Sequence, residues 1–154
     1  SQRTSYRYGV GAEYFFPAST FIGAEGKPRG GDGLRLAGQW IQARDGSLKR
    51  DGWYVQGSYR YSFPRRLLFD RYFRGIEPIV RYGVIETDLS PTPLLHGTWD
   101  RRQLLVGAII EVLREVSLKV EYAFNGERTG GRGSTPGPSS VGNDELLIEV
   151  ILQF

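Results

Sequence analysis

The chain has 154 residues, enough for a single domain over residues 1–154, and 40% of them are hydrophobic. Its formal net charge of +3 is too small to indicate a nucleic-acid partner, and without cysteine it has neither a disulfide framework nor a thiolate metal site. No apolar run approaches the roughly 20 residues of a transmembrane helix. Methionine is absent even from position 1, which indicates a mature protein without its signal peptide, or a fragment.

Strands with period-two alternation of apolar and mixed positions follow one another along the chain. In chain order they cover residues 6–16, 34–44, 53–63, 76–88, 103–112, 116–125 and 146–154. The segment 21–26 is either a short further strand, which makes eight, or irregular, which leaves seven. Polar segments rich in glycine and proline separate them, including 27–33, 45–52 and 126–142, and residues 113–115 predict a hairpin.

In five of these strands, the apolar side carries no charge over about ten residues, the length of a tilted strand that crosses a bilayer. A Lys or Arg there would cost roughly 2–4 kcal/mol in mid-membrane. The pattern therefore predicts an all-β, antiparallel transmembrane β-barrel with about eight strands visible, either a small barrel or the C-terminal half of a larger one. The alternative is a soluble β-sandwich, in which the aromatic side chains would point into a core.

Strand parity assigns residues to the two sides of such a barrel. The lipid-facing candidates are Val55, Tyr59, Val80, Val106, Ile110, Leu118, Val120, Ile148 and Val150. The pore-lining candidates are Arg7, Arg35, Arg60, Arg81, Lys119, Glu121 and Glu149. Basic groups dominate the first four strands and acidic groups the last. In a wide barrel, these opposed charges would set up an electric field across a water-filled pore. In an eight-stranded barrel, the same charges would form a buried salt-bridge network without a channel.

The inward parity also carries apolar residues on the later strands: Ile79, Ile85, Leu105, Ile109, Leu147 and Ile151. An open pore wall is not normally this apolar. Either an inward-folded loop, a second copy or a partner protein covers this patch, or the barrel is narrow and packed.

The chain ends on Phe154, preceded at alternate positions by Leu152, Val150, Ile148 and Leu146. This ending resembles the C-terminal β-signal of bacterial outer-membrane β-barrels. The resemblance implies the outer membrane of a Gram-negative bacterium, contact with its lipid, and a role for Phe154 as an assembly signal read by the barrel-insertion machinery. A periplasmic C-terminus then places 126–142 and 88–99 outside, and 113–115 and 64–75 inside.

Four segments in order resemble the phosphate-selective porin O/P family. They are D-G-W-Y-V-Q-G-S-Y at 51–59, E-P-I-V-R-Y at 77–82, the paired strands of 103–122, and the closing strand 144–154. The match covers roughly residues 33–154. Members of that family are longer, so the resemblance implies the C-terminal half of such a barrel or a shortened relative. Its selectivity rests on basic ladders and an inward loop mostly outside the matched part, so no phosphate-binding residue is carried over.

Catalytic and metal sites are poorly supported, and neither an enzyme nor a cofactor is expected. The single histidine, His96, shares a loop region with Ser90 and Asp100, but loop residues close in sequence are usually unrelated in their chemistry. Aspartates in glycine-rich turns lack the spacing of a calcium loop: Asp32, Asp45 and Asp51. The basic, aromatic segment 65–74 is either an amphipathic piece at an anionic membrane surface or a connection whose arginines snorkel at the rim.

Two functions remain from the sequence. The first is an outer-membrane porin for passive diffusion of small hydrophilic solutes, with anions as one candidate class. The second is a non-conducting barrel that serves as an anchor or as a sleeve around a partner protein. The family resemblance favours the first, and the apolar inward residues favour the second.

Overall fold

The computed structural model describes residues 5–18, 31–46, 48–63, 73–89, 98–113, 115–130 and 141–153. Their regular elements are β1 (Ser5–Pro17), β2 (Gly33–Asp45), β3 (Leu48–Ser62), β4 (Gly75–Leu89), β5 (Thr98–Glu111), β6 (Val116–Gly130), β7 (Val141–Gly142) and β8 (Glu145–Leu152). Within these ranges, no helix reaches the length and hydrophobicity needed to span a bilayer. The all-β class is therefore confirmed.

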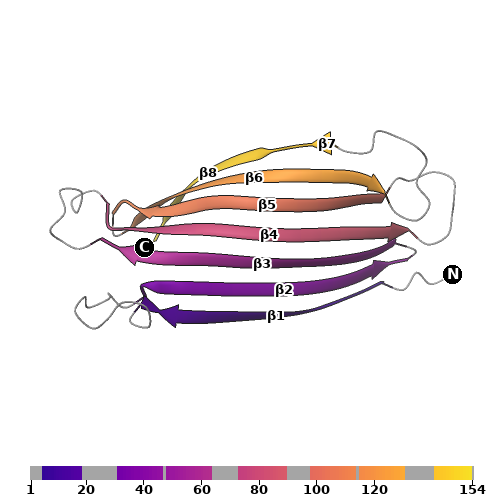
Figure 1. Cartoon of the computed structure of the whole chain (residues 1–154), viewed down its shortest axis with the longest axis horizontal. Helices are drawn as coiled ribbons and strands as arrows, with labels where there is room; N and C mark the ends of the chain where they lie inside the picture. The colour runs from indigo at the N-terminus through magenta and orange to yellow at the C-terminus, as the bar shows by residue number, and fades with distance from the viewer. Residues whose placement is uncertain are drawn as a thin grey trace.

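The strands form one antiparallel sheet in which each of β1 to β6 lies beside its neighbours in the sequence (Figure 1). β7 and β8 both pair with β6 and keep one register, because Gly126 lies opposite Gly142 and Ala123 lies opposite Glu145. They are thus one strand interrupted at residues 143–144, and the sheet is seven strands wide.

The sheet is open at both edges. In the described part of the chain, β1 pairs with β2 and β8 pairs with β6, and no pairing joins β1 to β8. The predicted small barrel, closed within this chain by its first and last strands, is therefore wrong. The antiparallel pairing of the last strand with β6 is confirmed, while the segment 21–26 lies outside the described residues.

The strands β1 to β6 have 13 to 15 residues each, longer than the alternation of apolar residues predicts. The polar segment 45–52, expected to be a turn, is mostly strand: Asp45 pairs with Leu48 in a tight hairpin. Gly46 has a φ of +63° there, which glycine adopts without a Cβ clash. β6 likewise continues to Gly130, into the segment expected to be a loop.

The expected hairpin between β5 and β6 is confirmed. The N–H groups of Val112 and Leu113 both donate to the Val116 carbonyl at 3.0 Å. This short connection allows β5 and β6 to pair antiparallel up to Glu111 and Ser117, at the start of the turn.

The sheet has two chemically different faces, since directly paired residues in an antiparallel sheet share a face. We call the side that carries Val55 and Val80 the apolar face, and the side that carries Gln56 and Arg81 the polar face. The buried hydrophobic side chains within the strands, Ile79, Leu105 and Ala123, lie on the polar face and are 5% to 7% exposed. Because crowding occurs on the inside of a curve, the sheet bends toward its polar face.

Candidate functional site

The polar face is the candidate functional surface because it collects the charged side chains of the strands. The register places all seven predicted pore-lining residues on this face: Arg7, Arg35, Arg60, Arg81, Lys119, Glu121 and Glu149. It places on the apolar face all nine predicted at the lipid surface: Val55, Tyr59, Val80, Val106, Ile110, Leu118, Val120, Ile148 and Val150. Their contact with pore water and with lipid stays a prediction.

The apolar face is exposed along its whole width. Its large side chains are 37% to 68% exposed: Tyr8, Val10, Tyr14, Leu36, Trp40, Trp53, Val55, Val80, Tyr82, Leu104, Val106, Tyr122, Phe124, Leu146, Ile148 and Val150. A soluble monomer rarely exposes a contiguous apolar patch beyond a few hundred Å². The row of large apolar side chains on this face is therefore unusual for a soluble monomer.

Aromatic rings form two groups on the apolar face, one toward each end of the strands. At the end of the β2–β3 hairpin, ring contacts join Tyr6 to Tyr8, Tyr8 to Trp40, and Trp53 to Tyr82. The contact between Tyr122 and Phe124 lies in the middle of β6, beside Val106 and Leu104. At the opposite end, they join Tyr14 to Phe16 and Tyr61 to Phe63. Aliphatic side chains such as Val55 and Val80 lie between the two groups.

Ion pairs connect neighbouring strands across the polar face. Arg35 on β2 lies 3.1 Å from Glu13 on β1, and Lys119 on β6 lies 3.8 Å from Glu149 on β8. Lys119 also lies 3.0 Å from Glu121 of its own strand. The Lys119 and Glu121 side chains are 23% and 12% exposed, whereas that of Glu149 is 52% exposed. The exposed Arg35–Glu13 pair is of a kind that typically contributes ~0–1 kcal/mol, so it adds little to the stability of the sheet.

One ion pair passes over a whole strand. Arg60 on β3 lies 2.5 Å from Glu111 on β5, although β4 separates the two strands. Gly75 of β4 lies directly beside Glu111, and a Cβ built on Gly75 would come within 3.4 Å of a Glu111 carboxylate oxygen. The missing side chain at Gly75 therefore leaves room for the bridge.

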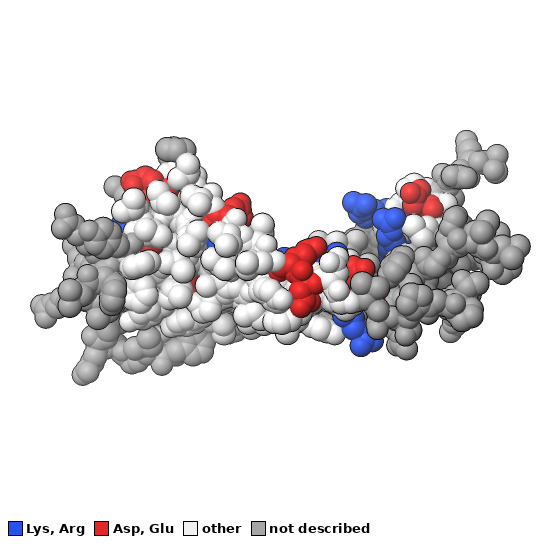
Figure 2. Space-filling view, turned by 90° about the horizontal axis from the view of Figure 1, so that it is seen from above, with Lys and Arg blue, Asp and Glu red and all other residues white. Residues whose placement is uncertain are grey.

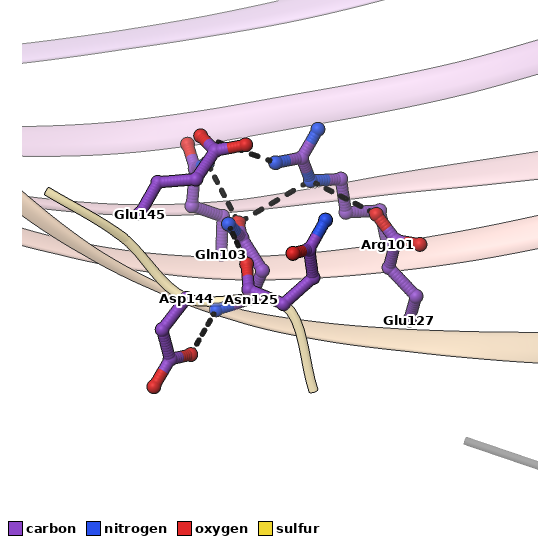
Figure 3. A network of polar contacts seen from close by, with 7 residues as sticks. Arg101, Gln103, Asn125, Glu127, Asp144 and Glu145 are labelled. Atoms are coloured by element: carbon purple, nitrogen blue, oxygen red, sulfur yellow. Dashed lines mark hydrogen bonds and ion pairs between the residues drawn. The ribbon is translucent and has the colours of Figure 1, made fainter. Parts of the chain in front are cut away.

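Asn125 is the centre of a polar network that holds β5, β6 and the start of β8 together (Figure 3). The Asn125 side chain is 4% exposed, and its Oδ1 accepts hydrogen bonds from Gln103 Nε2 at 2.8 Å and Arg101 Nε at 3.3 Å. Its Nδ2 donates to the Asn143 carbonyl at 2.6 Å, and its backbone N–H donates to Asp144 Oδ1 at 3.2 Å. The network replaces the sheet pairing that is interrupted between β7 and β8.

Arg101 extends this network toward two carboxylates. Its guanidinium lies 3.8 Å from Glu127 and 3.9 Å from Glu145, so a single cation contacts both β6 and β8 (Figure 3). At the apolar side of the same junction, Tyr122 Oη donates to Asp144 Oδ2 at 3.1 Å. The Asp144 carboxylate therefore accepts one hydrogen bond at each oxygen, from Tyr122 and from Asn125 of β6.

The apolar inward residues expected on the later strands lie on the polar face, among charged residues. The register sets them beside charged ones, in the pairs Ile85–Arg101, Leu105–Arg81, Ile109–Lys119 and Leu147–Glu121. Ile79 and Leu105 are already buried by their neighbours, whereas Ile85 and Leu147 are each 49% exposed. The polar face is thus a mixture of charged and apolar positions.

A hollow of about 340 Å³ lies on the polar face near the β2–β3 hairpin. Arginines from four strands line it, namely Arg7, Arg50, Arg81 and Arg101, together with Ile41, Tyr54 and Ile85. In Figure 2 the outline of the molecule dips between two higher ends, and basic side chains gather toward the right-hand end. Figure 1 places the β2–β3 hairpin at that same end.

Several residues of this surface were missed from the sequence. Arg50 lies in the segment expected to be a turn, and Arg101 precedes the expected start of its strand at 103. Both continue the inward parity of their strands, Arg50 with Tyr54 and Arg101 with Gln103. Extending the alternation past the apolar stretch would have found them.

Only some of the other residues considered from the sequence belong to the described part of the chain. Phe154, His96, Ser90 and the segment 64–72 lie outside the described residues. Asp100 Oδ1 accepts a hydrogen bond from the Thr87 N–H at 3.1 Å, and Asp32 Oδ1 accepts one from Ser62 Oγ at 2.6 Å. These two carboxylates therefore bond to neighbouring strands, and the described residues contain no cluster of three or more metal-type ligands.

Comparison with known proteins adds no assignment: no family model, no curated protein and no solved structure matches this chain.

Proposed function

We propose that this sheet is an arc of an outer-membrane β-barrel whose polar face lines a water-filled pore for passive diffusion of small hydrophilic solutes. The observation that carries the proposal is the contrast between the two faces. One face exposes a band of uncharged apolar side chains between two groups of aromatic rings. The opposite face carries arginine, lysine and glutamate side chains.

The height of the apolar band suits a membrane. Trp53 and Phe63 belong to opposite aromatic groups and lie ten positions apart along β3 and its end. At a rise of about 3.3 Å per residue they are about 33 Å apart along the strand, which becomes about 25 Å when the strand is inclined by 35–45°. Outer-membrane barrels carry an apolar band of about 25 Å between aromatic girdles.

The open edges of β1 and β8 also support the view that the sheet is part of a larger barrel and not a closed barrel by itself. An unpaired strand edge in lipid leaves several backbone groups without hydrogen bonds, at several kcal/mol each. We infer that further strands of the same protein complete the barrel, in agreement with the resemblance to the C-terminal part of a longer porin. Pairing between two copies of the present chain is the competing arrangement.

Single-channel recording in planar lipid bilayers tests the pore. The purified protein is added to one side of the bilayer, and discrete conductance steps are expected. If well-folded, bilayer-inserted protein produces no steps, the pore proposal is wrong. The non-conducting sleeve, which the exposed inward side chains of Ile85 and Leu147 favour, would then be the better account.

A further inference from the structure

The hollow near the β2–β3 hairpin combines apolar side chains with a group of arginines. Its floor is largely apolar and includes Ile41 and Ile85, which lie on either side of Gly52 in the pairing of β2, β3 and β4. Gly52 has no side chain to fill the space between the two isoleucines. The phenol ring of Tyr54 belongs to the next inward position of the same strand.

Positive charge surrounds this apolar floor. Four arginines and one carboxylate, Asp51, line the hollow. Among the described residues, no carboxylate lies within ion-pair distance of Arg7, Arg50 or Arg81. Arg101 reaches its two carboxylates only at 3.8 and 3.9 Å. The guanidinium groups are therefore available to an anion.

We propose that this hollow is a binding site for small anions that carry an aromatic ring, with aromatic carboxylates as the representative class. Arginine binds carboxylates through paired N–H donors and also stacks on aromatic faces. A purely polar anion would leave the isoleucine floor in contact with water, and a neutral ring would leave the arginines unpaired. An aromatic carboxylate satisfies both parts at once.

The volume of the hollow limits the size of this solute. At about 340 Å³ it lies at the lower end of the range for small-molecule sites, roughly 300–1,000 Å³. It therefore suits a single ring with one acidic group. The inference rests on the proposed function, which it deepens by naming the solute class that the pore wall retains.

The first test compares three anions on the unmodified protein in detergent micelles by isothermal titration calorimetry. Benzoate carries both the charge and the ring, acetate carries the charge alone, and inorganic phosphate carries more charge without a ring. Benzoate is expected to bind at least tenfold more tightly than acetate or phosphate. Equal or tighter binding of acetate or phosphate, or no binding of benzoate, would overturn the proposal.

The second test fills the hollow without changing its charge. A Cβ on Gly52 would make only ordinary contacts, 3.4 Å from the Val84 carbonyl oxygen and 3.5 Å from Ile85, so Gly52→Val fits the strand and extends into the hollow. Gly57→Val on the apolar face of the same strand is the matched control, with Leu36 as its nearest neighbour at 3.6 Å. Benzoate binding should be lost in Gly52→Val and retained in Gly57→Val, and equal binding by both would overturn the site.

The third test removes one charge. Arg81→Gln should weaken benzoate binding by about tenfold, the typical effect of losing one charge-assisted hydrogen bond. Arg102→Gln, on the opposite face of the neighbouring strand, should leave it unchanged. Equal affinities of the two variants would contradict the role of Arg81, and far-UV circular dichroism verifies that both are folded.

Single-channel recording separates this inference from the pore itself. Conductance steps that benzoate interrupts support both proposals. Steps that benzoate leaves unchanged, together with no calorimetric binding, keep the pore and overturn the site. Benzoate binding in micelles without any conductance keeps the site and overturns the pore.

Discussion

The guanidinium of Arg60 and the carboxylate of Glu111 meet at 2.5 Å across an intervening strand. Neighbouring strands in a sheet are about 4.8 Å apart, so these side chains lean toward each other over roughly twice that distance. The contact is possible because the sheet bends toward the polar face and because Gly75 leaves the path clear. It ties three strands together without any main-chain bond between the outer two.

A double-mutant cycle on Arg60→Gln and Glu111→Gln should reveal a coupling of ~0.5–1 kcal/mol in the free energy of unfolding, since both side chains are partly exposed. Urea unfolding in lipid vesicles provides the measurement. The cycle of Arg102→Gln with Glu111→Gln serves as the control, because these residues lie on opposite faces, and its effects should add. A coupling near zero in the first cycle would show that the bridge contributes nothing.

Lysine at Val55 tests the lipid face. Val55 is 53% exposed and lies two positions from Trp53 within the apolar band, so Val55→Lys should destabilise the inserted protein by ~1–2 kcal/mol if that band meets lipid. Gln56→Lys, one residue further and on the polar face, should change the free energy of unfolding by less than about 0.5 kcal/mol. Equal effects of the two substitutions on vesicle-inserted protein would contradict the assignment of faces.

Loss of the Asn125 side chain should loosen β8. Asn125→Ala removes the acceptor of Arg101 and Gln103 and the donor to the Asn143 carbonyl, at a cost of about 1–3 kcal/mol for unsatisfied buried groups. Amide hydrogen exchange in β8 should accelerate accordingly. Asn143→Ala is the matched control, because Asn143 enters the network through its backbone. Unchanged exchange in Asn125→Ala would rule out this anchoring role.

Deletion of Phe154 tests the resemblance to outer-membrane barrels. The truncated protein should be synthesised normally but assemble poorly, because the insertion machinery is expected to read the terminal aromatic residue. The fraction of heat-modifiable protein in the outer membrane is the readout, and Phe154→Tyr, which retains an aromatic end, is the control. Full assembly of the truncated protein would remove the support that the C-terminal ending gives to this localisation.

The two faces could be predicted from the sequence, but the strand ends could not. Alternation identifies a strand only where one face is apolar and the other is polar, as from Trp53 to Phe63. Beyond that band both faces are polar, so Lys49 and Arg50 look like turn residues although their backbones pair with β2 and β4. Main-chain hydrogen bonds can form with almost any side chain, so they cannot be read from residue type as side-chain burial can.

The pairs and cavities of the polar face also lay beyond the sequence. Parity places Arg60 and Glu111 on one side, but only the register and the bend of the sheet show that they meet across β4. The hollow depends on a glycine, Gly52, lying between two isoleucines of other strands. The sequence left a closed small barrel open as one of two alternatives, because strand count does not determine whether the first and last strands are within reach.

The order of the strands in space repeats their order in the chain, so each hairpin is built next to the one before it. Contacts between strands are therefore local in sequence, a topology that favours rapid formation of successive hairpins. Removing or duplicating one hairpin between two turns would preserve every remaining pair of neighbours. The width of such a sheet can change over evolutionary time in steps of two strands, and the diameter of any ring that it helps to form would change with it.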